Sequence, residues 1–258
     1  MSVLTDAHAL VRAYSTTWYE PVTSMPAKLN EATTAAYLCM RAIDEIEDHY
    51  DLAPPAKVEL LETTSRLLQT RFTRADFSAA YARHTHELPE VTLRIGEWAA
   101  LAPTEIAPRI CETFAAMAER MADWVGTGFA IDSERDLDRY TYAVSGTLVL
   151  LLSDLWAWYD GTRCDRSHGI AYGRALQAAN ILIDRSTDTD RGVDFWPTGW
   201  QSADMLRYIR TEFSLAEQYV DAFSQGPARR FCEPALRRYQ NALDARPRAA
   251  ATGVRPER

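Results

Sequence analysis

Apolar residues recur three and four positions apart along almost the whole chain, whereas runs in which Val, Ile or Thr alternate with polar residues are nearly absent. The first pattern puts apolar side chains on one face of an α-helix, and the second is the one that a half-buried β-strand needs. The chain is therefore expected to be all-α. Helices are expected over residues 3–19, 28–50, 55–71, 76–87, 89–100, 103–126, 133–159, 167–187, 202–224 and 227–245, with prolines near several helix starts.

The chain has enough apolar material for one large core, because 47% of its 258 residues are hydrophobic. No Pro-, Gly- or Ser-rich stretch interrupts the helical pattern, so residues 1–245 are expected to form a single domain. The last segment, 246–258, contains Pro247, Pro256 and several arginines. It is expected to be a disordered tail.

Charge and motifs exclude several classes of protein. A formal net charge of -8 repels nucleic acids and anionic membrane surfaces. The most apolar run, 148–152, is too short to be a membrane anchor. The four cysteines form no CxxC pair and the chain opens without an apolar signal region, which favours a cytoplasmic protein. Glycine-rich phosphate loops are missing as well, so a bound phosphate would need local cations or a metal ion.

A first acidic stripe lies within residues 37–49. Tyr37, Arg41, Asp44 and Asp48 follow one another at spacings of four, three and four, which stacks them on one face of a helix. The stripe combines a ring, a cation and two carboxylates. Taken alone, the same pattern is also typical of a solvated charged helix face.

A second stripe makes that alternative weaker. Gln177, Asn180, Asp184 and Asp188 follow one another at spacings of three, four and four, within a helix whose other residues are mostly apolar. Carboxylates in such surroundings need cations to compensate them. Two carboxylate pairs on facing helices favour Mg²⁺, which commonly completes its shell with water and substrate phosphate. The two stripes thus predict a metal-bridged diphosphate in a helical pocket.

The segments RAIDEIED at 41–48 and NILIDRSTDTDRGVDFWP at 180–197 resemble the two aspartate-rich motifs of the squalene and phytoene synthase family. The resemblance extends to the segments 15–18 and 139–146. It implies an isoprenoid-synthase-type helical bundle with a central pocket and a prenyl diphosphate substrate. It also implies metal ligation by Asp44, Asp48, Asp184 and Asp188, and catalytic roles for Tyr37, Asp44 and Asp184. The implied substrate contacts are Ser15, Thr16, Trp18, Arg41, Tyr142, Gly146, Gln177, Asn180, Ile183 and Val193.

The chain departs from the family pattern where squalene synthases carry arginines, because Thr16, Ile183 and Val193 stand at those positions. A tyrosine of the pattern is replaced by Ala143. Two prenyl diphosphates bring together roughly six negative charges, for which arginines are strong partners. We therefore expect the half of the site that binds the donor to be intact and the half that binds a second diphosphate to be neutralised.

This combination resembles the squalene-synthase-like prenyltransferases of bacterial secondary metabolism. It predicts a Mg²⁺-dependent enzyme that moves a short prenyl group, dimethylallyl in the first instance, from its diphosphate to an aromatic acceptor such as a carbazole quinone. A terpene cyclase and a head-to-head synthase are the enzymatic alternatives. A noncatalytic partner subunit is a third alternative, which the completeness of both acidic stripes disfavours. The sequence leaves the donor chain length, the acceptor and the oligomeric state open.

Overall fold

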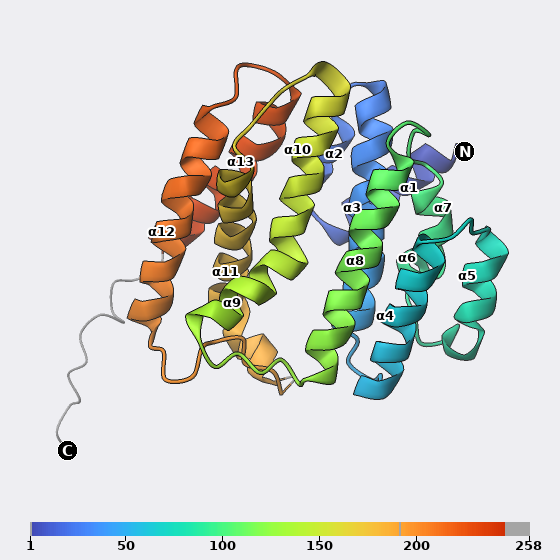
Figure 1. Ribbon diagram of the computed structural model, residues 1–258, viewed down its shortest axis with the longest axis horizontal. Helices are drawn as coiled ribbons and strands as arrows, with labels where there is room; N and C mark the ends of the chain where they lie inside the picture. The colour runs from blue at the N-terminus through green and yellow to red at the C-terminus, as the bar shows by residue number, and fades with distance from the viewer. Residues whose placement is uncertain (1, 191, 246–258) are drawn as a thin grey trace.

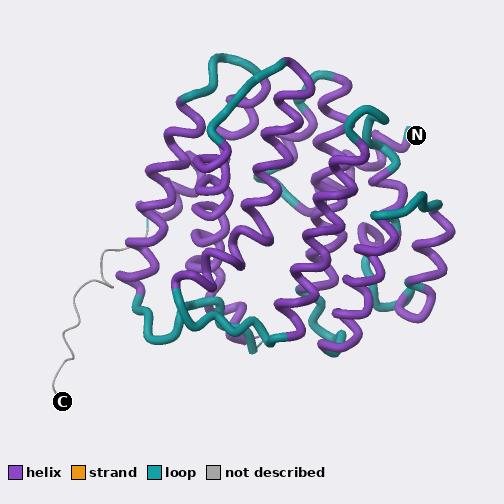
Figure 2. Tube along the Cα trace, viewed as in Figure 1, coloured by secondary structure: helices purple, strands orange, loops and turns teal. Residues whose placement is uncertain are grey.

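Every regular element is a helix in the computed structural model, which describes residues 2–190 and 192–245, and no strand occurs within these ranges (Figure 2). The all-α expectation is confirmed, and its physical basis is the three-and-four apolar spacing. The elements are α1 (Val3–Tyr14), α2 (Tyr19–Thr23), α3 (Ala27–Glu47), α4 (Pro54–Leu68), α5 (Arg74–Ala80), η1 (Ala82–His84), α6 (Glu90–Leu93), α7 (Ile95–Ala99), α8 (Ala107–Gly126), α9 (Glu134–Thr141), η2 (Tyr142–Gly146), α10 (Thr147–Asp160), α11 (Arg166–Asp190), α12 (Ser202–Asp221) and α13 (Pro227–Asp244).

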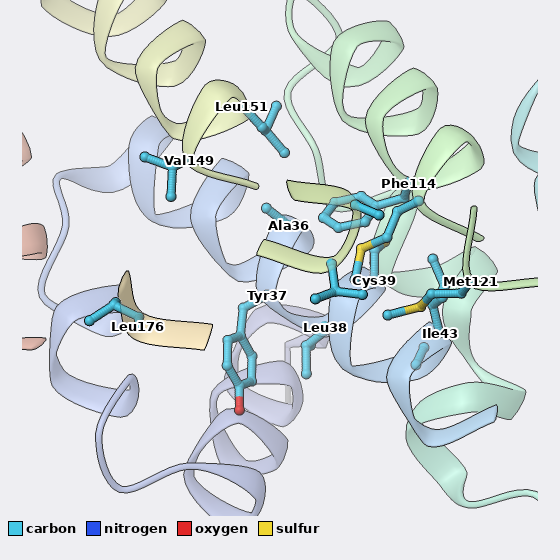
Figure 3. Packing of buried hydrophobic residues seen from close by; sticks show 14 of the residues in the cluster. Ala36, Tyr37, Leu38, Cys39, Ile43, Phe114, Met121, Val149, Leu151 and Leu176 are labelled. Atoms are coloured by element: carbon cyan, nitrogen blue, oxygen red, sulfur yellow. The ribbon is translucent and has the colours of Figure 1, made fainter. Parts of the chain in front are cut away.

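The long helices lie side by side, with α11, α12 and α13 on one flank, α4 to α7 on the other, and α3, α8 and α10 between them (Figure 1). Helix α4 packs along α8, α11 packs along α12, and α3 contacts α1, α8 and α10. One cluster of buried apolar side chains runs from α1 to α13. Figure 3 shows members of this cluster from α3, α8, α10 and α11 around Ala36 and Tyr37. The cluster fixes the helices that surround the site described below.

The first expected helix, 3–19, is interrupted after Tyr14, and the short helix α2 follows as a separate element. The interruption falls in the segment Ser15-Thr-Thr, where the Ser15 hydroxyl accepts a hydrogen bond from the Trp18 backbone N–H at 3.0 Å. Hydroxyl side chains compete in this way with the hydrogen bonds of a helix. Trp18, which follows the break, is partly buried and packs against the core.

The expected helix 133–159 contains a π-helical segment, η2, between α9 and α10. Helix α11 lies directly against this segment at two glycines: a Cβ atom on Gly173 would stand 2.8 Å from the Cα of Gly146. Wider π turns within α-helices frequently occur at functional sites. Here the segment brings Val144 and Ser145 to the wall of the central cavity.

The remaining differences concern short elements and boundaries. The expected helices 76–87 and 89–100 are each divided, the first into α5 and η1 and the second into α6 and α7. The expected tail 246–258 lies outside the described residues. Among those described, no helix has both the length and the apolarity required to cross a membrane.

Candidate functional site

A cavity of about 400 Å³ lies at the centre of the bundle, a size typical of sites for small molecules. Its wall comes from α1, α2, α3, α8, α9, η2, α10, α11 and α13, together with Phe195 in the loop after α11. Segments far apart in the sequence therefore meet at one site. The wall divides by chemistry into an acidic end and an apolar end.

Five carboxylate side chains form the acidic end: two from α3, one from Asp48 at the C-cap of α3, and two from α11. Asp44, Glu47 and Asp48 share a face of α3 because they are three and four residues apart, and Asp184 and Asp188 are one turn apart on α11. Glu47 is 5% exposed and Asp188 is 7% exposed, whereas Asp184 is exposed. The acidic end thus extends from the interior to the surface of the protein.

Arg41 is the one basic side chain among the described residues of the wall. Its Nη1 donates to Asp44 Oδ2 at 2.6 Å, and its guanidinium also pairs with Glu45 on the next turn. The same guanidinium lies over the ring of Tyr14, 5.3 Å from the centroid. Because Arg41 already has carboxylate partners, it does not offset the acidic end by itself.

The donor set suits Mg²⁺. Carboxylate oxygens are hard ligands, and Mg²⁺ is usually held by one or two protein carboxylates together with water and substrate phosphate. Among the described residues, no three His, Cys, Asp or Glu side chains converge closely enough to enclose an ion by themselves. The carboxylates of α3 and α11 therefore fit a metal ion that a bound diphosphate helps to hold.

Two tyrosines border the acidic end as neutral phenols. Burial raises the pKa of Tyr37 to about 12, although a hydrogen bond with the Ser15 side chain and the charge of Arg41 act in the opposite direction. Burial also raises the pKa of Tyr140, and the negative charges of Glu47 and Asp48 raise it further. Both hydroxyl groups consequently keep their protons near neutral pH and can donate hydrogen bonds.

Aromatic contacts hold the wall beside these carboxylates. The ring of Tyr140 stacks on Phe195, with centroids 4.7 Å apart and planes 19° apart. The ring of Phe195 also meets that of Phe129 edge to face, with centroids 5.3 Å apart. The next residue, Trp196, has the Arg185 guanidinium over its ring, 3.7 Å from the centroid. Arg185 also pairs with Asp194 at 2.8 Å. These contacts place one face of a ring stack at the cavity.

The apolar end is built from side chains that suit a hydrocarbon. Phe114 comes from α8, Leu148 and Leu152 from α10, and Phe231 from α13. Trp18 stacks on Phe231 with centroids 5.4 Å apart. A ligand with a charged head and an apolar tail would match this division of the wall.

The structure brings most of the sequence-predicted site residues to this one cavity. Those that line it are Ser15, Trp18, Tyr37, Arg41, Asp44, Asp48, Gln177, Asn180, Asp184 and Asp188. Their helical spacing accounts for this convergence, because each stripe occupies one face of its helix.

Five of the predicted substrate contacts do not line the cavity. Thr16 and Ile183 are exposed, and Val193 is half-buried in the loop after α11. Gly146 is buried against α11, and Tyr142 lines a different cavity. Ile183 and Asp184 are adjacent on α11, so their side chains point about 100° apart, and only Asp184 of the two lines the cavity.

Several wall residues were not singled out from the sequence. Glu47 could have been found, because it follows Asp44 by three residues on the same helix. Tyr239 hydrogen-bonds through its side chain with Asn180 and lies near Asp184. It comes from α13, and no local pattern connects it with α11. Phe195 similarly reaches the wall through the ring stack with Tyr140.

Comparison with known proteins gives a family for this arrangement. The family model described as squalene/phytoene synthase matches residues 11–258. The chain belongs to this family. Squalene synthase of Eremothecium gossypii is 27% identical over 232 residues, which cover 84% of this chain and 52% of that protein. Human squalene synthase is 27% identical over 183 residues, which cover 68% of this chain and 42% of that protein.

This member of the squalene/phytoene synthase family spans about half the length of the curated relatives it matches. Among solved structures, a complex of TcSQS with the ligand E5700 has a TM-score of 0.72 at 17% identity and covers 90% of this chain and 75% of its own. A dehydrosqualene synthase complex has a TM-score of 0.60 at 17% identity, over 93% and 84% of the two chains. These likenesses confirm the isoprenoid-synthase fold.

Proposed function

We propose that the cavity binds one prenyl diphosphate, with Mg²⁺ held by the carboxylates of α3 and α11, and transfers the prenyl group to an aromatic acceptor. Dimethylallyl diphosphate is the proposed donor, and a carbazole quinone represents the proposed acceptor class. The metal ligands would be Asp44, Asp48, Asp184 and Asp188. The observation that carries the proposal is the cavity itself, in which five carboxylates stand at one end and an apolar wall at the other.

The charges of the wall explain why a metal is part of the proposal. A diphosphate would meet repulsion from the carboxylates, and Arg41 is already paired with Asp44 and Glu45. When bound by these carboxylates, Mg²⁺ would supply positive charge that stabilises a leaving diphosphate. Tyr37 and Tyr140, as neutral phenols, can donate hydrogen bonds without adding charge. The apolar end receives the prenyl chain, whose burial is favourable at about 25 cal/mol per Å².

The proposed reaction is an alkylation. The C1–O bond of the donor breaks, and its electron pair leaves with the diphosphate. A carbon of the electron-rich arene forms the new bond to C1, and a diphosphate oxygen takes the proton lost from that carbon. Aromatic faces in the wall, such as that of Tyr140, stabilise the positive charge on the allyl group as it develops.

The scarcity of cations supports an uncharged second substrate. Among the described wall residues, Arg41 is the one basic group, and a second diphosphate would add about three more negative charges to an already acidic cavity. The positions Thr16, Ile183 and Val193 do not contribute to this wall. The charge of the cavity therefore supports an aromatic acceptor, whereas space at those three positions does not.

The first test compares two aspartates of α11. Asp188 lines the cavity, whereas Asp190 is exposed on the same helix and does not. We expect Asp188→Asn to lower prenyl transfer about 100-fold, as the loss of about 3 kcal/mol of charge stabilisation would do, while Asp190→Asn keeps wild-type activity. Mass spectrometry of the products from dimethylallyl diphosphate and a panel of carbazole quinones, naphthols and indoles measures the effect. Full transfer in EDTA, or equal losses in both variants, would contradict the metal proposal.

A head-to-head synthase is the second candidate, because curated relatives are named squalene synthases. That reaction requires two diphosphates in the cavity. We expect farnesyl diphosphate with NADPH to give neither squalene nor presqualene diphosphate, since the described wall offers one arginine for both. Gas chromatography of the extracted products decides between the two reactions. Formation of either product at ordinary turnover would replace the aromatic prenyltransferase proposal with the head-to-head one.

A further inference from the structure

A second cavity of about 370 Å³ lies on the other side of the helical wall that contains η2. It is bordered by α8 and by the α9–η2 segment, and its wall includes Arg120, Trp124, Arg139 and Tyr142. The chain alternates between the two cavities here: Tyr140, Val144 and Ser145 line the central one, whereas Tyr142 and Ala143 line the second. The ring of Trp124 meets that of Tyr140 edge to face at 5.5 Å, so aromatic side chains separate the two spaces.

Arg120 stands apart from the other arginines of the described chain. Each of the remaining arginines that is half-buried has a carboxylate partner: Arg41, Arg94, Arg174, Arg185 and Arg229. Arg120 is half-buried too, but it forms no ion pair with a carboxylate among the described residues. Its guanidinium lies instead over the ring of Tyr142, 5.6 Å from the centroid. A partly desolvated guanidinium without a counter-ion is unfavourable. A ligand anion would supply that counter-ion.

The contact with Tyr142 leaves the hydrogen-bonding capacity of Arg120 intact. An aromatic face attracts the guanidinium through its π electrons and uses none of its N–H donors. Those donors have the planar fork geometry that pairs with a carboxylate. Next to them, the rings of Trp124 and Tyr142 offer surfaces on which a flat ligand can pack.

The two aspartates of this cavity do not neutralise Arg120. Asp136 lies in the first turn of α9, where it accepts a hydrogen bond from the hydroxyl of the N-cap residue Ser133 at 2.7 Å. Arg139 approaches Asp136 at 3.8 Å, while its guanidinium also lies 6.0 Å from the ring centroid of Trp124. Asp123 is exposed. The positive charge that faces the cavity without an acidic partner is therefore that of Arg120.

We propose that this cavity is a binding site for a planar aromatic ligand with one carboxylate, whose acid group pairs with Arg120 and whose ring packs on Trp124 and Tyr142. The site is distinct from the one assigned to the prenyl diphosphate, and binding to it requires no metal. The rings of Trp124 and Tyr140 lie between the two sites, and no described residue lines both cavities.

The test uses the full chain in EDTA and naphthalene-2-carboxylate as the probe, with the neutral naphthalene-2-methanol as its match. Ligand-observed NMR titration should show that the carboxylate binds at least about tenfold more tightly than the alcohol. Arg120→Gln should weaken binding of the carboxylate about tenfold or more. Arg135→Gln, which removes an exposed charge on α9 outside the cavity, should leave binding unchanged.

A second variant tests the site independently, in case Arg120→Gln does not fold. Ala130 is an exposed residue of the cavity wall, so Ala130→Glu adds a negative charge at low cost to the fold and should also weaken binding. Inorganic diphosphate with Mg²⁺ should leave the probe bound, because it would occupy the central cavity. The proposal would be overturned if the probe did not bind up to about 1 mM, or if the alcohol bound equally well. It would also be overturned if binding were unchanged in both Arg120→Gln and Ala130→Glu, or if Mg²⁺–diphosphate displaced the probe. These readouts need no catalysis, so a failed prenyl transfer assay would leave them interpretable.

Discussion

At the scale of one residue, burial changes the pKa of Glu212, a carboxyl group away from the central cavity. Its side chain is 9% exposed, and its Oε2 has no hydrogen-bond partner among the described residues. Burial raises the pKa of Glu212 to about 7; the charge of Arg174 lowers it, and those of Asp138 and Glu134 raise it. The carboxyl group therefore carries less charge near neutral pH than its neighbours on the surface do.

This raised pKa predicts a pH-dependent stability. The folded protein binds a proton at Glu212 more readily than the unfolded chain, so the free energy of unfolding falls as pH rises from about 4.5 to about 7. Glu212→Gln lacks this loss. We expect its melting temperature, relative to wild type, to be higher at pH 8 than at pH 5 by about 2 °C or more.

The control for that measurement is Glu119→Gln, which removes an exposed carboxylate. Its melting temperature relative to wild type should differ little between the two pH values. A Glu212→Gln variant whose difference from wild type is the same at pH 5 and pH 8 would show that the group is charged throughout.

The same scale shows which of the predicted site residues the structure places at the cavity wall. Asp44 and Asp184 were selected by helical spacing, and both line the cavity. Ile183 and Val193 were selected by their place in a family pattern, and neither lines it. Helical spacing predicts the direction in which a side chain points, because each residue turns the helix by about 100°. A residue's place in a family motif does not predict that direction when the local backbone is unknown.

At the scale of elements, the type of each long helix could be predicted, but the interruptions could not. The π-helical segment η2 lies against α11, a contact between residues that are distant in sequence. At the break after Tyr14, the Ser15 hydroxyl accepts a hydrogen bond from a backbone N–H. The spacing of apolar residues does not predict such a hydrogen bond.

The close contact between η2 and α11 predicts that adding one methyl group at Gly173 lowers the stability of the protein. In Gly173→Ala, the new Cβ would stand 2.8 Å from backbone atoms of Gly146, so one of the two elements must move. We expect a loss of stability of about 2 kcal/mol or more. Thermal denaturation followed by circular dichroism measures the loss.

Gly126→Ala is the matched control for that substitution. Its Cβ would meet Val58 at an ordinary contact distance of 3.9 Å, at the end of α8. Stability should stay the same or rise slightly, because alanine favours helices more than glycine does. Equal stabilities of the two variants would show that α11 and η2 have room to separate.

At the scale of the whole molecule, the site exists only because the bundle closes. The α3 and α11 carboxylates are more than a hundred residues apart in sequence, and each stripe alone is compatible with a solvated helix face. Folding sets them around one cavity, together with Tyr239 from α13 and Phe195 from a loop. The sequence could therefore predict the two acidic faces, whereas the residues that complete the wall depend on tertiary packing.

The most direct test of this account is a crystal structure of the protein with Mn²⁺ in place of Mg²⁺ and a non-hydrolysable thiolo analogue of dimethylallyl diphosphate. We predict anomalous scattering from Mn²⁺ between the diphosphate and the aspartates Asp44, Asp48, Asp184 and Asp188, with the prenyl chain toward Phe114 and Phe231. Asp190→Asn should give the same density, and Asp188→Asn should weaken it. A diphosphate bound in the cavity without metal, or Mn²⁺ bound away from α3 and α11, would contradict the account.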